Sequence, residues 1–193
     1  IMTYVFTKIS GLPENQIMGS GTILDTARLR YGLSEHFKVA QGNIHAYVFG
    51  EHGDTSFIPW TGAYISGLST DEYYEEMKAH GKDVKPLDKE AMLEYVQKSG
   101  GKVIAKKGAT FYAVSATVCQ LVGLILAASD SLATVSSMLH GEYGIEDVCL
   151  STLTLVGPNG IQGKVQMRMN KEEVALLKKS ADALKEVIAQ IEL

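Results

Sequence analysis

The sequence Gly157-Pro158-Asn159-Gly160-Ile161-Gln162-Gly163 follows an apolar segment and has the glycine spacing of a phosphate loop. A dinucleotide-binding loop must open a helix, because the helix N-terminus holds the pyrophosphate. Here the residues after the last glycine alternate with period two, most clearly at Val165, Met167 and Met169. These glycines therefore predict a hairpin turn rather than a nucleotide site.

Outward from this hairpin, helical and strand periodicities predict an α+β fold in which helices pack on short, mostly antiparallel strands. The expected helices cover 1–10, 22–37, 70–79, 86–107, 110–129 and the segment after Asn170, and the expected strands cover 16–21, 44–49, 56–66, 131–140, 147–156 and 163–169. Thr22 with Asp25, and Asn170 with Glu173, have the spacing of helix-capping pairs. Gly100-Gly101 within a helix costs about 2 kcal/mol relative to alanine, which predicts a kink or a close helix crossing there.

Composition limits the class of protein. The chain has 193 residues, of which 46% are hydrophobic and 21% charged, as in one globular domain. A net charge of −4 argues against a dedicated binder of nucleic acid or membrane surfaces. The apolar run 109–130 is interrupted by polar residues, so we expect a buried helix rather than a membrane span. Cys119 and Cys149 form no CxxC motif, which favours free thiols and a cytoplasmic location.

The most informative stretch for chemistry is 50–55, Gly-Glu-His-Gly-Asp-Thr, which follows an alternating strand. A histidine between glycines at a strand end presents its ring to a ligand, and its ordinary pKa of about 6.5 suits proton transfer. One alternative is a turn histidine with no chemical role. Another is a metal site, since His45, Glu51, His52 and Asp54 lie close in sequence, but strand ends scatter such side chains, so we expect no metal.

A second group, Asp25 and Arg28, shares one face of the predicted helix 22–37. One interpretation is a surface ion pair worth about 0.5 kcal/mol. The other is functional: a carboxylate can fix the tautomer of a histidine, and a guanidinium can bind a substrate carboxylate through two hydrogen bonds. Local pattern leaves these two interpretations open.

Longer motifs resemble the L-lactate dehydrogenase family, of the bacterial type regulated by fructose bisphosphate. They are Ser20-Gly21-Thr22, Leu24-Asp25-Thr26-Ala27-Arg28 and the family's active-site signature Gly50-Glu51-His52-Gly53-Asp54-Thr55, with further similarity at 106–110, 141–144 and 178–182. The resemblance covers essentially the whole chain. It implies that 1–193 is one substrate-binding domain of lactate/malate dehydrogenase type, with the nucleotide-binding Rossmann domain outside this chain.

This resemblance also implies roles for individual residues in the NAD-dependent interconversion of pyruvate and L-lactate. His52 would protonate the 2-oxo group, Asp25 would orient His52, and Arg28 would hold the substrate carboxylate. Thr110 would line the pocket near the substrate's side chain. The resemblance implies that NAD is bound mainly by the N-terminal domain.

Arg30 and His45 match family positions that bind fructose 1,6-bisphosphate across a subunit interface, and the resemblance implies a homotetramer. The alternatives are that Arg30 is a solvated helix residue and that His45 is an outward-facing strand residue. Sister malate enzymes typically have glycine at the position of Glu51, and branched 2-hydroxy-acid enzymes often have asparagine at that of Asp54, so both residues favour lactate. A malate or branched-acid enzyme, or a structural domain without turnover, remain the alternatives.

Overall fold

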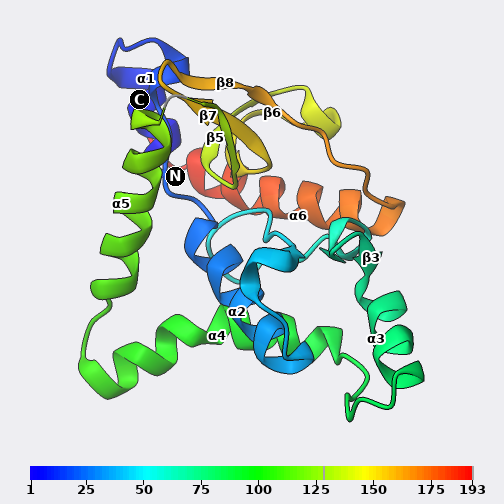
Figure 1. The fold of residues 1–193 in the computed structure, drawn as a ribbon. Helices are drawn as coiled ribbons and strands as arrows, with labels where there is room; N and C mark the ends of the chain where they lie inside the picture. The colour runs from blue at the N-terminus through cyan, green and yellow to red at the C-terminus, as the bar shows by residue number, and fades with distance from the viewer. Residues whose placement is uncertain (128, 193) are drawn as a thin grey trace.

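The structure is a computed structural model that describes residues 1–127 and 129–192. In that part of the chain, six α-helices surround short antiparallel strands (Figure 1), which confirms the predicted α+β class. The helices are α1 (Met2–Ile9), α2 (Ile23–Phe37), α3 (Thr70–Ala79), α4 (Lys89–Lys107), α5 (Tyr112–Leu126) and α6 (Lys171–Ile188). The strands are β1 (Ile44–His45), β2 (Tyr64–Ile65), β3 (Leu68–Ser69), β4 (Ser131–Ala133), β5 (Ser136–His140), β6 (Glu146–Ser151), β7 (Thr154–Gly157) and β8 (Gly160–Lys164).

The glycine-rich stretch forms the predicted hairpin. β7 and β8 pair antiparallel, with Gly157 opposite Gly160 and a two-residue turn between them. Gly160 has φ +83°, and a Cβ there would clash with the carbonyl oxygen of Asn15, so this position requires glycine. The hairpin belongs to the sheet β4-β7-β8, and separate sheets are formed by β1-β2-β3 and β5-β6.

The last predicted strand is misplaced, since β8 ends at Lys164. Val165 still donates its N–H to the carbonyl of Leu153 at 2.9 Å, but beyond it the extended chain pairs with no strand of the described residues. Met167 and Met169 instead pack against the hydrophobic cluster around α6. The alternating pattern therefore reflects an extended segment with one buried side, not a strand of a sheet.

Other strand predictions are too long. The expected strand 16–21 is reduced to a single bridge between Gly19 and Ser136, and 44–49 to β1 with a bridge at Phe49. The first half of 56–66 is wrong because Pro59 leads into a 3-10 turn before β2. The long segments 131–140 and 147–156 are each divided into two strands that join different sheets.

The helices match their predicted ranges more closely, and Asn170 and Glu173 form the expected capping box on α6. The hydroxyl of Thr22 does not cap α2, since it donates to the carbonyl of Val48 instead. α4 continues without a break through the glycine pair at 100–101, so the expected kink is wrong. α2 and α4 approach closely at Gly32 instead, where a Cβ would lie 2.7 Å from the sulfur of Met92.

α5 is not the buried helix that its composition predicts. Only Thr117 and Leu121 are buried in the described helix, whereas Tyr112 is 74% exposed and Leu126 79% exposed. The reason is that α5 packs along one face only, against α2 and β7. The predicted end of this helix includes residue 128, which lies outside the described residues. None of the helices described is both long enough and apolar enough to cross a membrane.

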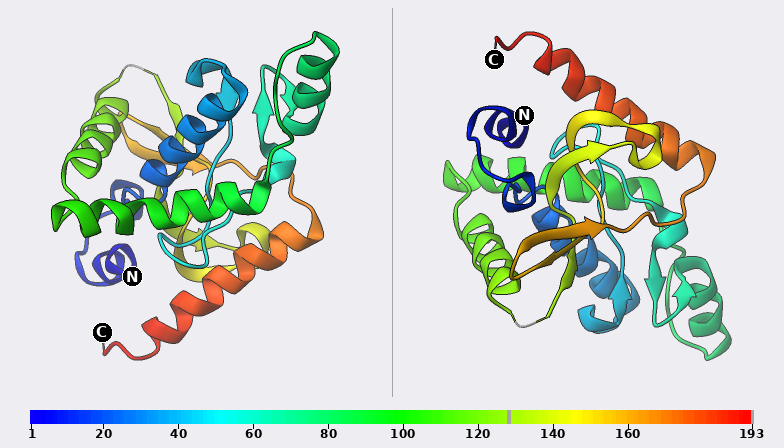
Figure 2. Two further views of the ribbon diagram at one scale, coloured as in Figure 1. Left: turned by 90° about the horizontal axis from the view of Figure 1, so that it is seen from below. Right: turned by 90° about the horizontal axis from the view of Figure 1, so that it is seen from above.

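Two hydrophobic clusters form most of the core. One lies between α2, α4 and β1, and the other lies between the β5-β6 sheet and α6, with α4 crossing α2 on one side of the molecule (Figure 2). Val48 belongs to the first cluster and Phe49 to the second, and both are fully buried. The segment 50–55 therefore leaves the junction of the two clusters, on backbone that is fixed from both sides.

Candidate active site

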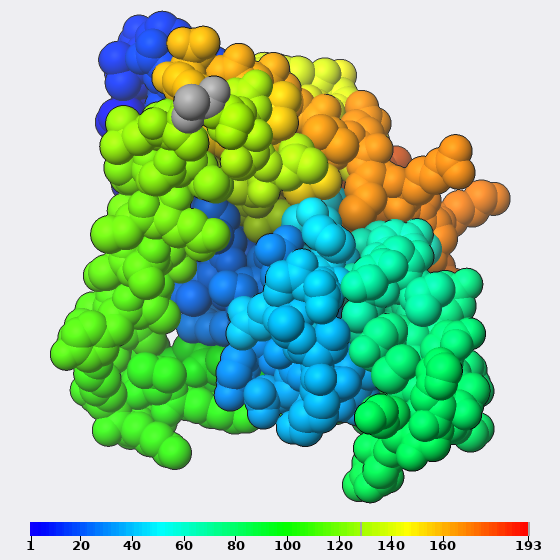
Figure 3. Space-filling view, in the orientation of Figure 1, coloured from blue at the N-terminus to red at the C-terminus, as the bar shows by residue number. Residues whose placement is uncertain are grey.

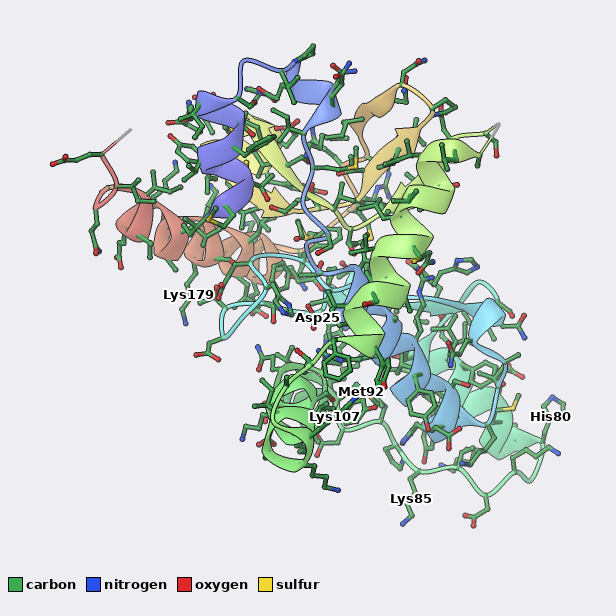
Figure 4. The ribbon with its side chains drawn as sticks, turned by 90° about the vertical axis from the view of Figure 1, so that its left-hand side faces the viewer. Asp25, His80, Lys85, Met92, Lys107 and Lys179 are labelled. Atoms are coloured by element: carbon green, nitrogen blue, oxygen red, sulfur yellow. The ribbon has the colours of Figure 1, made fainter. Side chains whose placement is uncertain are left out.

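His52, Asp25 and Arg28 are brought together by the packing of α2 against the segment before residue 50. His52 Nδ1 donates to Asp25 Oδ2 at 2.6 Å, and Arg28 Nη1 donates to Asp25 Oδ1 at 3.1 Å. Asp25 is 5% exposed and lies near the centre of the molecule, whereas His80 and Lys85 point outward from its periphery (Figure 4). The interpretation of Asp25 and Arg28 as a surface ion pair is thus wrong.

The electrostatics of this group favour a protonated imidazole. The hydrogen bond to Asp25 raises the pKa of His52 above its usual 6.5, and the negative charges of Asp25 and Glu51 act in the same direction. Burial and the positive charge of Arg28 oppose this increase in the pKa. Asp25 also lies in the first turn of α2, where the helix dipole favours a negative charge. The His52 side chain is 61% exposed, so its free Nε2 is accessible to a ligand.

Gly50 anchors the start of the histidine loop. It exchanges backbone hydrogen bonds of 3.0 Å with Ser151 at the end of β6. Its φ is +96°, and a Cβ would lie 2.8 Å from the hydroxyl oxygen of Ser180 on α6. The turn into the loop and its close approach to α6 both require glycine here.

A ring of hydrogen bonds then holds Glu51 and Thr55. The Glu51 N–H donates to Ser180 Oγ at 2.8 Å, and the Glu51 carboxylate accepts from the N–H and hydroxyl of Thr55 at 3.1 and 3.0 Å. The two hydroxyls of Thr55 and Ser180 are 3.0 Å apart, and Ser180 is fully buried. Since the Thr55 hydroxyl donates to the carboxylate, that of Ser180 is left to donate to Thr55, which closes the ring.

α4 holds the other end of the loop through Gln97. Its amide nitrogen donates to the carbonyls of Ser56 at 2.9 Å and Asp54 at 3.2 Å. Ser56 in turn donates its hydroxyl to the carbonyl of Gly53 at 2.7 Å. Three helices therefore fix the loop: α2 through Asp25, α4 through Gln97 and α6 through its buried serine.

These anchoring residues were missed by the sequence analysis. Ser180 is a polar residue on the buried face of α6, next to Ala181 and one turn from Leu177, and that position was a usable signal. Gln97 gave no such signal, because nothing local indicates that its amide faces the loop.

A cavity of about 530 Å³ lies in front of the ionic group, and the space-filling view shows the surface hollowed between α2 and α5 (Figure 3). It is lined by Leu24, Asp25, Arg28, His52, Gly53, Ser56, Gln97, Gly100, Gly101, Ile104, Thr110 and Val114. The predicted residue Thr110 is thus on the wall of the same cavity as His52. This volume lies within the range of about 300–1,000 Å³ that is usual for small-molecule sites.

A second cavity, of about 410 Å³, shares His52 with the first. It includes Gly19, Gly21 and Gly50, which have no side chain, and the small Ser20, so a flat ring can approach the backbone closely there. These residues could hold a cofactor ring beside the imidazole. A cavity of about 560 Å³ next to α1 is lined by two ion pairs, Lys8–Asp147 and His140–Glu14, together with Glu146.

Arg30 and His45 both lie outside the two cavities that contain His52. Arg30 Nε donates to the carbonyl of Ala46 at 3.1 Å, and its guanidinium lies 5.1 Å from the ring centre of Tyr47. His45 is exposed on β1. Among the residues described, no group of three or more His, Cys, Asp or Glu side chains could hold a metal ion.

Comparison with known proteins places this geometry in context. Residues 22–192 match the family described as lactate/malate dehydrogenase, alpha/beta C-terminal domain. The L-lactate dehydrogenase of Acetivibrio thermocellus is 45% identical over 193 residues, which are 100% of this chain and 60% of that protein. L-lactate dehydrogenase 1 of Clostridium acetobutylicum is 42% identical over 191 residues, or 99% of this chain and 60% of its own length.

Solved structures of L-lactate dehydrogenases have the same fold as this chain. An L-lactate dehydrogenase from Clostridium thermocellum superimposes with a TM-score of 0.89 at 35% identity, covering 100% of this chain and 62% of its own. The ligand-bound minor L-lactate dehydrogenase of Enterococcus mundtii gives a TM-score of 0.91 at 30% identity, covering 100% and 60%. The chain therefore spans about 60% of the length of the relatives that it matches.

Proposed function

The chain belongs to the lactate/malate dehydrogenase family, as its alpha/beta C-terminal domain, and from this we propose that it is the catalytic half of an NAD-dependent L-lactate dehydrogenase. The reaction is the interconversion of pyruvate and L-lactate. The observation that carries the proposal is the buried carboxylate of Asp25, which binds His52 at 2.6 Å and Arg28 at 3.1 Å on the wall of one cavity.

His52 is the acid and base in this proposal. Because Asp25 accepts from Nδ1, the tautomer is fixed and Nε2 carries the exchangeable proton. In the reducing direction, Nε2–H donates its proton to the 2-oxo oxygen as the carbonyl carbon is reduced, and in oxidation Nε2 takes the proton from the hydroxyl. The raised pKa of His52 supports this role, because it favours the protonated imidazole that donates in the reducing direction.

Arg28 binds the substrate carboxylate. One of its five N–H donors is used by Asp25, and the others are available for a bidentate contact with a carboxylate. Its side chain is 16% exposed, so the pair it forms is partly desolvated and stronger than an ion pair at the surface. Thr110 completes the wall of the same cavity.

NADH, when bound, supplies the hydride that reaches the carbonyl carbon. The cavity on the other side of His52, with Gly19, Ser20, Gly21 and Gly50, has the small residues that a flat nicotinamide ring needs for close approach. In this proposal, those residues hold the ring while His52 positions the carbonyl oxygen.

A malate enzyme is the nearest alternative. Oxaloacetate carries a second carboxylate, which needs a second cation. Apart from Arg28 and His52, no basic residue of the described chain lines the cavity. This supports a substrate with an uncharged side chain.

The test is turnover by the intact gene product that carries these residues. We expect NADH oxidation with pyruvate, a much lower rate with oxaloacetate, and loss of turnover in His52→Gln. A variant at the exposed Lys179 of α6, Lys179→Gln, controls for nonspecific effects of a surface substitution. No pyruvate-dependent oxidation in the wild type would refute the proposal.

We further propose that Arg30 and His45 bind the effector fructose 1,6-bisphosphate in a cytoplasmic homotetramer. Arginine N–H donors suit a phosphate, and Arg30 is held in place by the carbonyl of Ala46, the residue after His45. Introduction of a negative charge at either position, by Arg30→Glu or His45→Glu, should abolish activation by the sugar bisphosphate. Activation that survives both substitutions would refute this site, and light scattering of the intact protein tests the tetramer.

A further inference from the structure

The second cavity beside His52 contains one negatively charged side chain, that of Glu51. Apart from these two residues, the described residues that line the cavity are small or apolar, and none is a lysine or arginine. Within the described chain, the carboxylate of Glu51 forms no ion pair, whereas that of Asp25 pairs with both Arg28 and His52. The charge of Glu51 is therefore not neutralised by the described residues of the site.

The carboxylate of Glu51 is also held in a fixed position. Its Oε1 accepts hydrogen bonds from the N–H and the hydroxyl of Thr55 at 3.1 and 3.0 Å, and the Glu51 N–H donates to Ser180 Oγ at 2.8 Å. Both carboxylate oxygens would lie 2.8 Å from a Cβ at Gly53, so they pack directly against the histidine loop. A charge that is fixed in this way acts on a neighbouring group without having to reorient.

The charge of Glu51 acts on the boundary between the two cavities. His52 lines both cavities, and the negative charge of Glu51 is one of the causes that raise the pKa of this histidine. A carboxylate that is close enough to act on the imidazole also acts on a charge placed beside that imidazole in the second cavity. Since Glu51 is half-buried, water screens this effect in part and does not abolish it.

Nicotinamide is the part of the cofactor whose charge differs between its two redox states. The oxidised ring carries one positive charge and the reduced ring carries none, whereas the phosphates and riboses are the same in NAD⁺ and NADH. A carboxylate on the wall of the cavity therefore attracts the oxidised ring and has no comparable effect on the reduced ring.

We propose that Glu51 sets the preference of the site between the two redox states of the nicotinamide, by favouring the oxidised, positively charged ring. The inference rests on the proposed function, which assigns the nicotinamide ring to the cavity that Glu51 and His52 share. It adds to that function a residue that determines which form of the cofactor binds more tightly.

The experiment measures the dissociation constants of NAD⁺ and NADH for the intact protein by isothermal titration calorimetry, with no substrate present. The quantity compared is the Kd for NAD⁺ divided by the Kd for NADH, because the contributions of the shared parts of the two dinucleotides cancel in this ratio. In Glu51→Gln the amide oxygen can still accept from Thr55, but the charge is lost. We expect the ratio to rise about fivefold, as for the loss of one partly screened charge.

A change in the protonation of His52 cannot mimic this result. Loss of the Glu51 charge lowers the pKa of His52, and a less positive imidazole favours the oxidised ring, which would lower the ratio. The wild-type protein gives a further measurement that needs no variant. Its ratio should rise with ionic strength, because salt screens the carboxylate.

Two control variants separate the charge from other effects. Glu186→Gln removes the same charge at an exposed position of α6, outside both cavities that contain His52, and should keep the wild-type ratio. Ser180→Ala removes a hydrogen bond that holds the histidine loop but leaves the Glu51 carboxylate in place. It should change both dissociation constants by the same factor, so that the ratio stays constant.

Each outcome separates the two proposals. A ratio that rises in Glu51→Gln and stays constant in both controls supports the inference. An unchanged ratio in Glu51→Gln, or an equal rise in either control, overturns the inference and leaves the proposed function intact. If neither dinucleotide binds to the wild-type protein, the proposed NAD-dependent function is overturned, and the inference falls with it.

Discussion

The link between Asp25 and His52 gives the sharpest prediction, tested by Asp25→Asn. The substitution keeps the shape of the side chain but removes the charge that His52 Nδ1 contacts at 2.6 Å. The pKa of His52 should fall, because the hydrogen bond and the charge of Asp25 are what raise it above 6.5. In the proposed mechanism, reduction needs protonated His52, so the rate is highest below this pKa and is lost as pH rises through it. The decrease in the rate of pyruvate reduction with rising pH should therefore occur at lower pH in the variant.

The size of the effect follows from burial. A hydrogen bond to a charged group contributes about 1.5–3 kcal/mol, and the 61% exposure of His52 reduces this through solvent screening to about 1 kcal/mol. Because the pKa of His52 is raised in the folded protein, the contribution of this hydrogen bond to the free energy of unfolding is fully present below pH 6.5. It is lost as the pH rises through the pKa of His52 in the folded protein. A change of about 1 kcal/mol corresponds to about a fivefold change in the protonation equilibrium of His52, so the rate of reduction at pH values above this pKa should fall about fivefold.

The assay is a pair of pH series. Initial rates of pyruvate reduction between pH 5.5 and 9.5 give the pH at which the rate decreases, and urea unfolding at the two ends gives the pH-dependent stability. Asp182→Asn, at an exposed position on α6, is the control and should change neither. An unchanged pH dependence of the rate in Asp25→Asn would refute the argument that this carboxylate sets the protonation of His52.

Two further substitutions test the supports of the site. Arg28→Lys should raise the KM for pyruvate about 100-fold with a smaller effect on kcat, because an ammonium cannot reproduce the bidentate contact; steady-state kinetics measure this split. Ser180→Ala leaves the Glu51 N–H without its buried acceptor and should lower the free energy of unfolding by about 1–3 kcal/mol, measured in urea. The same variant should lower kcat by a larger factor than it changes KM. If kcat and KM changed by equal factors, a role of Ser180 in positioning the histidine loop would be contradicted.

The sequence predicts those parts of the fold that depend on local pattern. The helix ranges, the α6 capping box and the hairpin at Gly157–Gly160 all follow from spacing and turn chemistry, and the structure contains them. Strand lengths could not be predicted in this way. An alternating pattern indicates that one side of an extended segment is buried, but it does not indicate whether another strand pairs with that segment. Val165–Met169 has the pattern but no pairing strand in the described chain, since its methionines pack against α6.

The candidate site, too, could be predicted from the sequence only in part. Asp25 and Arg28 lie three residues apart on one helix, so their proximity is visible in the sequence, and His52 stands out between two glycines. Whether the three meet depends on the packing of α2 against the chain before residue 50, through Thr22 and Thr26. The hydroxyl of Thr22 donates to the carbonyl of Val48, and the Val48 N–H donates to Thr26 Oγ1 at 3.0 Å. These tertiary hydrogen bonds have no local signature.

The α5 helix shows why composition alone misjudges exposure. Its apolar content predicts burial, yet it contacts the rest of the described chain along one face, and Tyr112 and Leu126 remain exposed. Thr110 lies two residues before this helix and lines the cavity, as does Val114 within it, so the position of α5 sets one wall of the site. A contact that covers the open face of α5 would thus also fix the wall that meets the substrate. In the proposed function, the packing of α5 should therefore influence which substrates fit the cavity beside Arg28.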